Sequence, residues 1–189
     1  VEIILERLDE NNLLLADLGT GSGAIALAIA SERENWQIVA TDLSEAALSI
    51  AKQNAKNLKL SNIEFRHGSW TEALEGKKSN EQNKKQNNEL FDAIISNPPY
   101  IDKTDKHLSQ GDVRFEPMQA LVAEEKGLAD LKQITTNAQK NLKPGAILLL
   151  EHGYQQGEVV RQLLEQSGYK EIQTYNDLAG LERVSIGRK

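Results

Sequence analysis

The chain has 189 residues, 39% of them hydrophobic and 26% charged, with a formal net charge of −6, so we expect one soluble cytoplasmic domain with a sizeable core. No apolar run is long enough for a membrane span, no signal peptide opens the chain, and the lack of cysteine with three widely separated histidines predicts neither a disulfide nor a metal site. The acidic balance disfavours a nucleic-acid partner, because proteins that grip nucleic acid usually present a basic face.

The amino-terminal segment predicts a helix followed by a nucleotide cradle. Apolar spacing over Val1–Leu8 is typical of an amphipathic helix, and its abrupt start without methionine leads us to expect a missing upstream part. Asn12–Gly19 is a predicted strand that enters the glycine-rich turn Gly19–Ala24, and a helix then extends through Arg33. Such a turn lets a ligand approach the backbone closely, and the helix start offers free N–H groups.

Two further strands follow. Gln37–Thr41 is a predicted strand that ends at Asp42, with Trp36 as ordinary packing at its start. Ser44 is a candidate N-cap for a helix to about Leu58. Asn62–Arg66 is the third predicted strand and leads into the sequence H-G-S-W.

The segment Glu75–Glu89 differs in kind from the rest of the chain. It contains no apolar residue and is dominated by Lys, Asn, Gln and Glu. A tongue that contacts RNA is one interpretation, but this composition is more typical of a solvated surface insertion.

The stretch Phe91–Tyr100, F-D-A-I-I-S-N-P-P-Y, predicts a buried central strand that ends in a stiff turn. Open α/β sheets bind ligands at the carboxyl ends of such strands. The Asn97 side-chain oxygen and the Pro98 carbonyl are acceptors that can each take one N–H of a planar NH2 group, and Tyr100 offers a ring for stacking. A loop that merely closes the strand is the alternative, but the direct succession of strand and N-P-P-Y favours a binding function.

The remaining segments complete an α/β pattern. Ile101–Lys126 is a long irregular segment beside the candidate site, which favours a functional loop. The predicted elements after it are a helix over Gly127–Leu142, a strand over Ala146–Glu151, a helix over Gln155–Ser167, and strands over Lys170–Asn176 and Arg183–Gly187. The last two strands are joined by too few residues for a crossover helix, so they should form an antiparallel hairpin. The prediction is a mostly parallel sheet with that hairpin at its end.

The glycine-rich turn leaves two cofactors open. Gly19–Ala24 fits the loose dinucleotide fingerprint, and Asp42 lies at the right spacing for a ribose, so both NAD and S-adenosylmethionine are compatible. Asp17 discriminates between them, because a carboxylate beside the turn repels a pyrophosphate but suits the ammonium of an amino-acid cofactor. Asp17 could instead only accept hydrogen bonds from the amides of the turn. We favour S-adenosylmethionine.

Together these motifs resemble class I S-adenosylmethionine-dependent methyltransferases that act on planar nitrogen. The motifs are D-L-G-T-G-S-G, then T-D at the second strand end, then S-N-P-P-Y. The resemblance narrows to the HemK/PrmC protein-glutamine methyltransferases through the following shared segments: Gly68–Trp70, Arg114–Pro117, Ala120-Leu121, Gly127-Leu128, Leu150–Glu158 and Asp177–Arg183. It covers nearly the whole chain except Glu75–Glu89, although N-P-P-Y alone is shared with DNA-adenine and some RNA methyltransferases.

The resemblance implies a fold, a substrate and a set of site residues. The fold is a Rossmann-like, seven-stranded, mostly parallel sheet with helices on both faces and a carboxyl-terminal antiparallel hairpin. The substrate is the glutamine of the Gly-Gly-Gln motif in class 1 peptide-chain release factors. The implied catalytic residues are Asn97, Pro98 and Tyr100; the implied cofactor-binding residues are Asp17, Gly19, Thr20, Gly21, Gly23, Asp42, Leu43, Trp70 and Asn97; and the implied substrate-binding residues are Asn97, Pro98, Pro99, Tyr100 and Glu116.

The sequence departs from this family at its start, where the N-terminal helical domain and the P-R-P-E-T-E segment are absent. We therefore treat residues 1–189 as the catalytic domain with an insertion at 75–89. Arg114 and Glu116 are candidates for shaping the substrate loop, with a structural ion pair as the alternative, and His152 fits a structural or cofactor-edge role better than that of a general base. Two other functions remain open: an amino methyltransferase for DNA adenine or rRNA, and a nucleotide-binding module or NAD enzyme.

Overall fold

The computed structural model describes residues 1–75, 89–99, 101–102, 122–123 and 128–189. The helical elements are α1 (Glu2–Arg7), α2 (Ala24–Glu32), α3 (Glu45–Asn57), the 3-10 helix η1 (Trp70–Leu74), α5 (Ala129–Ala138) and α6 (Gly157–Gln166). The strands are β1 (Leu14–Leu18), β2 (Gln37–Asp42), β3 (Ile63–His67), β4 (Phe91–Ser96), β5 (Ile101–Asp102), β6 (Val122–Ala123), β7 (Leu142–Glu151), β8 (Lys170–Asn176) and β9 (Glu182–Arg188).

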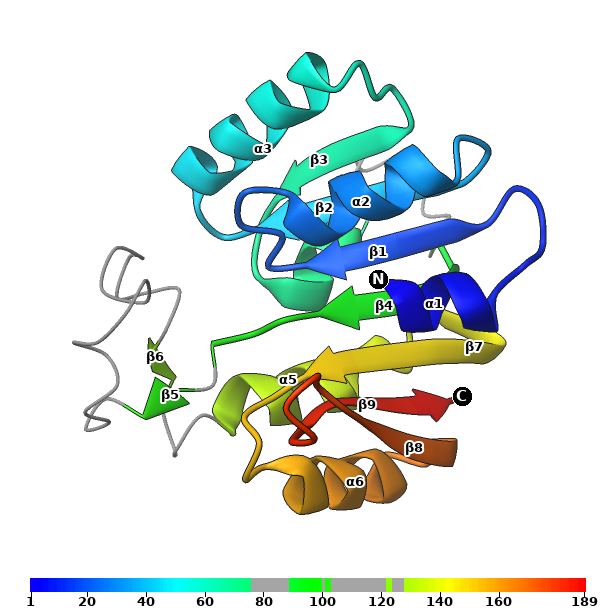
Figure 1. The fold of residues 1–189 in the computed structure, drawn as a ribbon, viewed down its shortest axis with the longest axis vertical. Helices are drawn as coiled ribbons and strands as arrows, with labels where there is room; N and C mark the ends of the chain where they lie inside the picture. Colours follow the sequence, from blue (N-terminus) through cyan, green and yellow to red (C-terminus); the bar gives the residue numbers. More distant parts are fainter. Residues whose placement is uncertain (76–88, 100, 103–121, 124–127) are drawn as a thin grey trace, which may run out of the picture.

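The main sheet has seven strands in the order β3-β2-β1-β4-β7-β9-β8 (Figure 1). Neighbouring strands from β3 to β7 are parallel, whereas β9 is antiparallel to both β7 and β8. The predicted mostly parallel sheet with a carboxyl-terminal hairpin is therefore confirmed. The sequence did not predict that the second strand of the hairpin would lie between β7 and β8.

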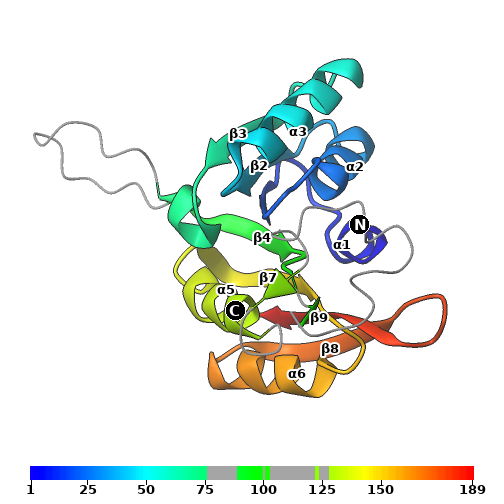
Figure 2. The same ribbon diagram turned by 90° about the vertical axis from the view of Figure 1, so that its left-hand side faces the viewer.

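Helices cover both faces of the sheet, as Figure 2 shows with α5 on one side and α1 and α2 on the other. Alternate residues of the central strands supply the two cores. Ala16 and Ile94 belong to the cluster packed by η1, α5 and α6, whereas Leu15 and Ile95 belong to the cluster packed by α1 and α2. Trp36 is fully buried in the second cluster, which confirms its expected packing role. Because both faces are covered, the central strands β1, β4 and β7 are mostly apolar and buried.

The hydrogen-bond pattern of α3 confirms its predicted start. The Ser44 hydroxyl oxygen accepts a hydrogen bond from the Ala47 amide at 3.2 Å, which satisfies one of the free N–H groups of the first turn. Ser44 lies two positions after the last residue of β2. The helix start is therefore held at the carboxyl edge of the sheet, beside Asp42.

Three segments differ from the sequence predictions in kind or by more than two residues at one end. Strand β7 begins at Leu142, not at Ala146, and thus includes Pro144; the pairing of β4 with β7 shifts register between Phe91 and Ala93, and such an irregularity tolerates proline. Helix α5 ends at Ala138, before the predicted end at Leu142. Within the segment predicted to be irregular, β5 and β6 pair in parallel, beyond the end of β4 (Figure 1). Most of the predicted insertion lies outside the described residues, but Glu89 is described and pairs with Arg66 at 2.9 Å.

Candidate active site at the carboxyl edge of the sheet

A cavity of about 550 Å³ lies at the carboxyl ends of β1, β2 and β4. Seven of the residues singled out in the sequence line it: Gly19, Gly21, Asp42, Leu43, Trp70, Asn97 and Pro99. The other lining residues were not predicted as site residues: Ser44 was expected only as an N-cap, and Gly68 and Ser69 were noted only within the shared segment Gly68–Trp70. The sequence analysis did not single out Ala47, Asp130 and Gln133. Asp130 and Gln133 come from α5, whose sequence carries only a core-facing helical pattern, so no local signal marked them.

The glycine-rich turn is held against the end of β2. The amides of Gly19 and Thr20 both donate to the Thr41 carbonyl, at 2.9 and 2.8 Å. Gly19 has a φ of 72°, and a Cβ at this position would lie 2.8 Å from Cζ3 of Trp70. Gly19 is therefore required for two reasons, its left-handed backbone and the close approach of the indole.

Asp42 is oriented by two backbone amides. Its Oδ2 accepts a hydrogen bond from Gly21 N and its Oδ1 accepts one from Ser44 N, both at 2.8 Å. Each carboxylate oxygen can accept a further hydrogen bond, because it has more than one lone pair. Asp42 can thus bind a vicinal pair of hydroxyl groups at the cavity while it braces the turn.

Asp17 lies beneath the glycine turn and does not line the cavity. It is 1% exposed, and its Oδ2 accepts hydrogen bonds from the Thr20 hydroxyl at 2.6 Å and from Ala26 N at 3.2 Å. Its Oδ1 has no hydrogen-bond partner among the described residues. Burial raises the pKa of Asp17 to about 6, although the bonds from Thr20 and Ala26 act to lower it. The interpretation that Asp17 only serves the turn thus accounts for one of its two oxygens.

Trp70 connects the glycine turn to α5. Its backbone lies in the left-handed region with a φ of 41°, which is uncommon for a bulky residue. Its indole Nε1–H donates to Asp130 Oδ1 at 3.3 Å, while the other end of the ring lies against Gly19. The indole therefore forms a fixed aromatic surface of the cavity.

The Asn97 turn follows the end of β4. The buried Ser96 hydroxyl donates to the Leu18 carbonyl at 2.8 Å, which ties the end of β4 to the end of β1. Asn97 is exposed at the cavity, Pro98 is buried and Pro99 is half-buried. The other residues expected near the substrate, Tyr100, Arg114 and Glu116, lie outside the described residues.

His152 takes part in a buried polar network away from this cavity. Its Nδ1 lies 3.0 Å from the Gly153 carbonyl, and its Nε2 lies 2.9 Å from the Ser185 hydroxyl, which is 2.9 Å from the Thr174 hydroxyl. Because a carbonyl only accepts, Nδ1 carries the proton and the neutral ring accepts from Ser185. Burial lowers the pKa of His152, which favours this neutral form. The structure thus supports a structural role.

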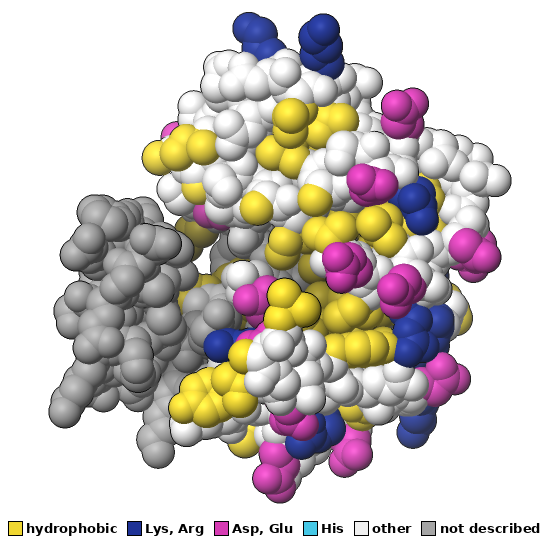
Figure 3. Space-filling view, in the orientation of Figure 1, with side chains coloured by type: hydrophobic (Ala, Val, Ile, Leu, Met, Phe, Trp, Pro, Cys, Tyr) yellow, Lys and Arg dark blue, Asp and Glu magenta, His cyan; other side chains and the backbone are white. Residues whose placement is uncertain are grey.

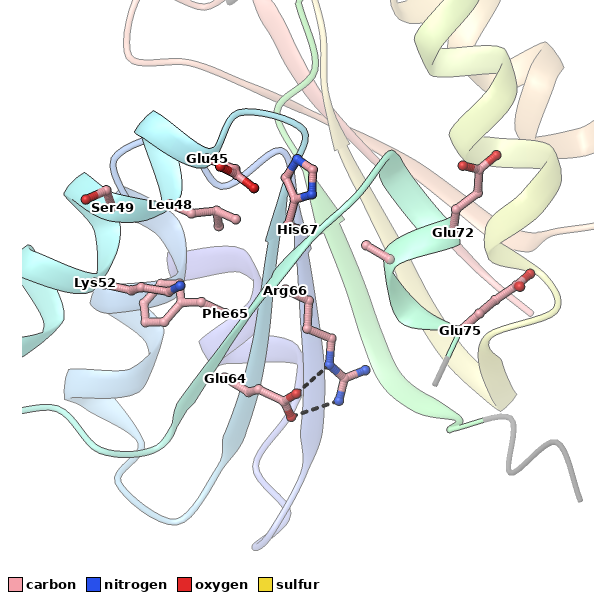
Figure 4. Close-up of a pocket in the computed structure, with 11 residues that line it drawn as sticks. Glu45, Leu48, Ser49, Lys52, Glu64, Phe65, Arg66, His67, Glu72 and Glu75 are labelled. Atoms are coloured by element: carbon pink, nitrogen blue, oxygen red, sulfur yellow. Dashed lines mark hydrogen bonds and ion pairs between the residues drawn. The ribbon is translucent and has the colours of Figure 1, made fainter. Parts of the chain in front are cut away.

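A larger hollow of about 780 Å³ lies elsewhere, between α3, η1 and the edge strand β3 (Figure 4). Its walls are mainly charged, and Glu64 forms two hydrogen bonds with Arg66 there, at 2.7 and 2.8 Å. None of the site residues that the sequence predicted lines this hollow. We therefore place the site in the smaller cavity, where the glycine turn, Asp42 and Asn97 converge.

The part of the chain that the structure describes has neither a group of metal-ligating side chains nor a membrane-spanning helix. Among these residues, no three or more His, Cys, Asp or Glu side chains are grouped so as to hold a metal ion. No described helix combines the length and the apolar character that crossing a membrane requires.

Comparison with known proteins agrees with this geometry. Residues 9–184 match the family described as "Methyltransferase domain". The chain belongs to this methyltransferase domain family. The methyltransferase domain is 48% identical over 188 residues to the release factor glutamine methyltransferase of Salmonella typhimurium strain LT2, and 47% identical over 188 residues to that of Escherichia coli strain K12. Both alignments include the whole chain but 64% of each relative, so the chain spans less than two thirds of their length.

Solved structures show the same fold at low sequence identity. The ribosomal protein L11 methylase of Lactobacillus delbrueckii subsp. bulgaricus superposes with a TM-score of 0.68 at 18% identity, covering 100% of this chain and 76% of that one. A methyltransferase from Pyrococcus furiosus has a TM-score of 0.67 at 17% identity, covering 100% of this chain and 80% of the other. The predicted class I methyltransferase fold is confirmed.

Proposed function

We propose that this domain transfers a methyl group from S-adenosylmethionine to the side-chain amide of the glutamine in the Gly-Gly-Gln motif of class 1 peptide-chain release factors. One observation carries the reaction type: Asn97, at the end of β4, lines the same cavity as the glycine turn, Asp42 and Trp70. Support for the substrate comes from relatives at 45–49% identity that are named release factor glutamine methyltransferase.

The residues present fit the cofactor. The buried Asp17 carboxylate keeps one oxygen without a partner among the described residues, which suits the ammonium of the methionine part. The oriented carboxylate of Asp42 suits the ribose hydroxyls, and the indole of Trp70 suits the adenine ring. A Cβ at Gly19 would meet Trp70, so the glycine preserves space at the centre of this surface.

The contribution of the Asn97 turn is orientation and polarisation of the amide. When bound, S-adenosylmethionine supplies a methyl group on a positively charged sulfur. An amide nitrogen is a poor nucleophile, because its lone pair is delocalised into the carbonyl. The Asn97 side-chain oxygen and the Pro98 carbonyl each accept one N–H, which raises electron density on the nitrogen and fixes its direction. The nitrogen gains the methyl group as the bond from that carbon to sulfur breaks, with its electron pair left on sulfur, and the nitrogen releases one of its two protons to solvent.

Surface charge bears on the nucleic-acid alternative. On the face seen in Figure 3, Lys and Arg side chains of the described residues lie scattered among Asp and Glu side chains. The chain as a whole is acidic, with a net charge of −6. These observations favour the protein substrate over DNA adenine or rRNA. For NAD, the pyrophosphate would lie beside the Asp17 carboxylate, and the Asn97 turn would have no role.

The test is transfer of labelled methyl from S-adenosylmethionine to a purified class 1 release factor. The matched control is the same factor with Gln-to-Ala in its Gly-Gly-Gln motif, and S-adenosylhomocysteine binding is measured in parallel. We expect label on the unaltered factor alone. Intact cofactor binding without label on the factor would show that the release factor is not the substrate. Label on DNA or rRNA under the same conditions would establish the nucleic-acid amino methyltransferase instead. If NAD displaced S-adenosylmethionine from the site and S-adenosylhomocysteine did not, the proposed methyl transfer would be wrong.

A further inference from the structure

The α5 wall of the cavity has been given no contact with the cofactor or the substrate. Asp130 and Gln133 line it and lie three positions apart on the helix, so they project from the same face. Asp130 accepts the indole N–H of Trp70, so that edge of the indole faces α5. A flat heterocycle stacked on the indole is therefore bounded by α5 on the side of the indole N–H.

Two polar side chains on the other walls already make hydrogen bonds. The Asp42 carboxylate accepts two backbone amides, and the Ser44 hydroxyl caps α3. Asn97 is assigned to the substrate amide. By contrast, no hydrogen bond ties the Gln133 carboxamide to any described residue, although this side chain lines the cavity.

Adenine presents an amino donor beside a ring-nitrogen acceptor. A carboxamide carries an acceptor beside a donor and can therefore pair with both groups at once. Of the described side chains that line the cavity, Asn97 and Gln133 are the carboxamides. Asn97 follows β4, whereas Gln133 comes from the helix that the indole N–H faces.

We propose that Gln133 recognises the adenine of the cofactor, with its side-chain oxygen accepting from the 6-amino group and its side-chain NH2 donating to the adjacent ring nitrogen. This role rests on the proposed function, because it assigns a specificity to the same cofactor site. Asp130 is then a positioning residue that keeps the indole in place. The class of ligand that this wall selects is an adenine nucleoside, in preference to a purine nucleoside without the amino group.

The experiment is a cycle of two ligands and two proteins, measured by titration calorimetry on the 189-residue chain. The ligands are S-adenosylhomocysteine and its 6-deamino analogue, in which hydrogen replaces the adenine amino group. The proteins are the unaltered chain and Gln133→Leu, a substitution that keeps a good helix former at an exposed helical position. The matched control is Gln162→Leu, the same change at an exposed position of α6 that does not line the cavity.

We expect the unaltered chain to bind S-adenosylhomocysteine about 5- to 10-fold more tightly than the 6-deamino analogue, as one hydrogen bond predicts. Gln133→Leu should bind both ligands equally, Gln162→Leu should retain the preference, and Gln133→Glu should retain it as well, since a carboxylate still accepts from the amino group. An unchanged preference in Gln133→Leu would overturn the role of Gln133 while leaving the cofactor site intact. Failure of the unaltered chain to bind S-adenosylhomocysteine would overturn the proposed function itself, and the role of Gln133 with it.

Discussion

The hydroxyl of Ser96 donates a 2.8 Å hydrogen bond to the carbonyl of Leu18, between two residues that are paired in register at the ends of β4 and β1. Asn97 follows the first of them and Gly19 follows the second. The two motifs are separated by 78 positions in the sequence, yet this buried bond holds them side by side. The relative position of the amide clamp and the glycine turn thus depends on one side chain as well as on the strand pairing.

Ser96→Ala should lower both the stability of the fold and the turnover number, by separate effects. Loss of the buried hydrogen bond should lower the free energy of unfolding by about 1 kcal/mol. Turnover should also fall under conditions in which nearly all molecules are folded, because the Asn97 turn is no longer tied to β1. Denaturant unfolding and methyl transfer at a temperature well below the transition measure the two effects. An unchanged turnover number would show that strand pairing alone positions the turn.

Asp17→Asn should stabilise the free protein and weaken cofactor binding. The pKa of Asp17 is raised from 3.8 to about 6, so the charged form destabilises the fold at neutral pH by about 3 kcal/mol. The stability of the native chain that this group confers is present below pH 4 and is lost as the pH rises through 6. Removal of the charge should therefore raise the free energy of unfolding at pH 7 by about 1–3 kcal/mol.

The same pKa predicts how cofactor affinity depends on pH. The ionised carboxylate attracts the cofactor ammonium, so affinity for S-adenosylhomocysteine should fall about tenfold per pH unit below pH 6. Titration calorimetry from pH 5 to pH 8 measures this change. In Asp17→Asn the affinity should be lower and nearly constant over the acidic part of that range. Parallel pH profiles for the two proteins would exclude Asp17 as the partner of the ammonium.

Asn97→Ala should reduce turnover and leave cofactor binding nearly intact. The substitution removes one of the two acceptors that orient the amide, and loss of one such polar group costs about 10²–10³ in turnover. Asn97 is exposed, so the fold should be unaffected. Single-turnover methyl transfer and S-adenosylhomocysteine titration give the two quantities. An equal loss in both would mean that Asn97 serves the cofactor and not the substrate.

Gly19→Ala should be more harmful than an equivalent change elsewhere. Gly168 is the matched control, because its φ of 86° resembles the 72° of Gly19 but a Cβ there has no neighbour within 4 Å. Gly168→Ala should cost about 1–2 kcal/mol of unfolding free energy from backbone strain alone. Gly19→Ala should cost about 1–3 kcal/mol more, because its Cβ would lie 2.8 Å from Trp70. It should also shift the tryptophan emission; equal costs in the two variants would show that the indole moves freely.

His152→Ala should act on stability and not on chemistry. It removes one of the two hydrogen-bond partners of the buried Ser185 hydroxyl and leaves Thr174 as the other, at a cost of about 1–3 kcal/mol. Because burial lowers the pKa of His152, the unfolded chain binds its proton more readily, and the stability from this group is lost as the pH falls below about 6.5. Thermal unfolding from pH 5 to pH 8 should show this acid-side loss weakened in the variant. A large fall in turnover per folded molecule would revive a catalytic role for His152.

Local sequence patterns were sufficient for most elements but not for their bounds. The apolar run Phe91–Ser96 predicted β4 at its observed residues, because a strand buried on both faces has few alternatives. The start of β7 was missed because Pro144 and Gly145 are typical stop signals, whereas long-range pairing with β4 carries the strand across them. The order of the strands along the chain also does not reveal that β9 lies between β7 and β8 in the sheet.

The sequence by itself determined the alternating strands and helices, the glycine turn, and the stiff turn at Asn97, since each depends on backbone conformations that a few adjacent residues set. Only the tertiary structure decided that β1 lies between β2 and β4, and hence that Gly19, Asp42 and Asn97 share one cavity. It also brought Asp130 and Gln133 of α5 to that cavity and left one oxygen of Asp17 buried without a described partner. These relations arise from strand order and from packing across the sheet, which join residues far apart in the chain and leave no local pattern.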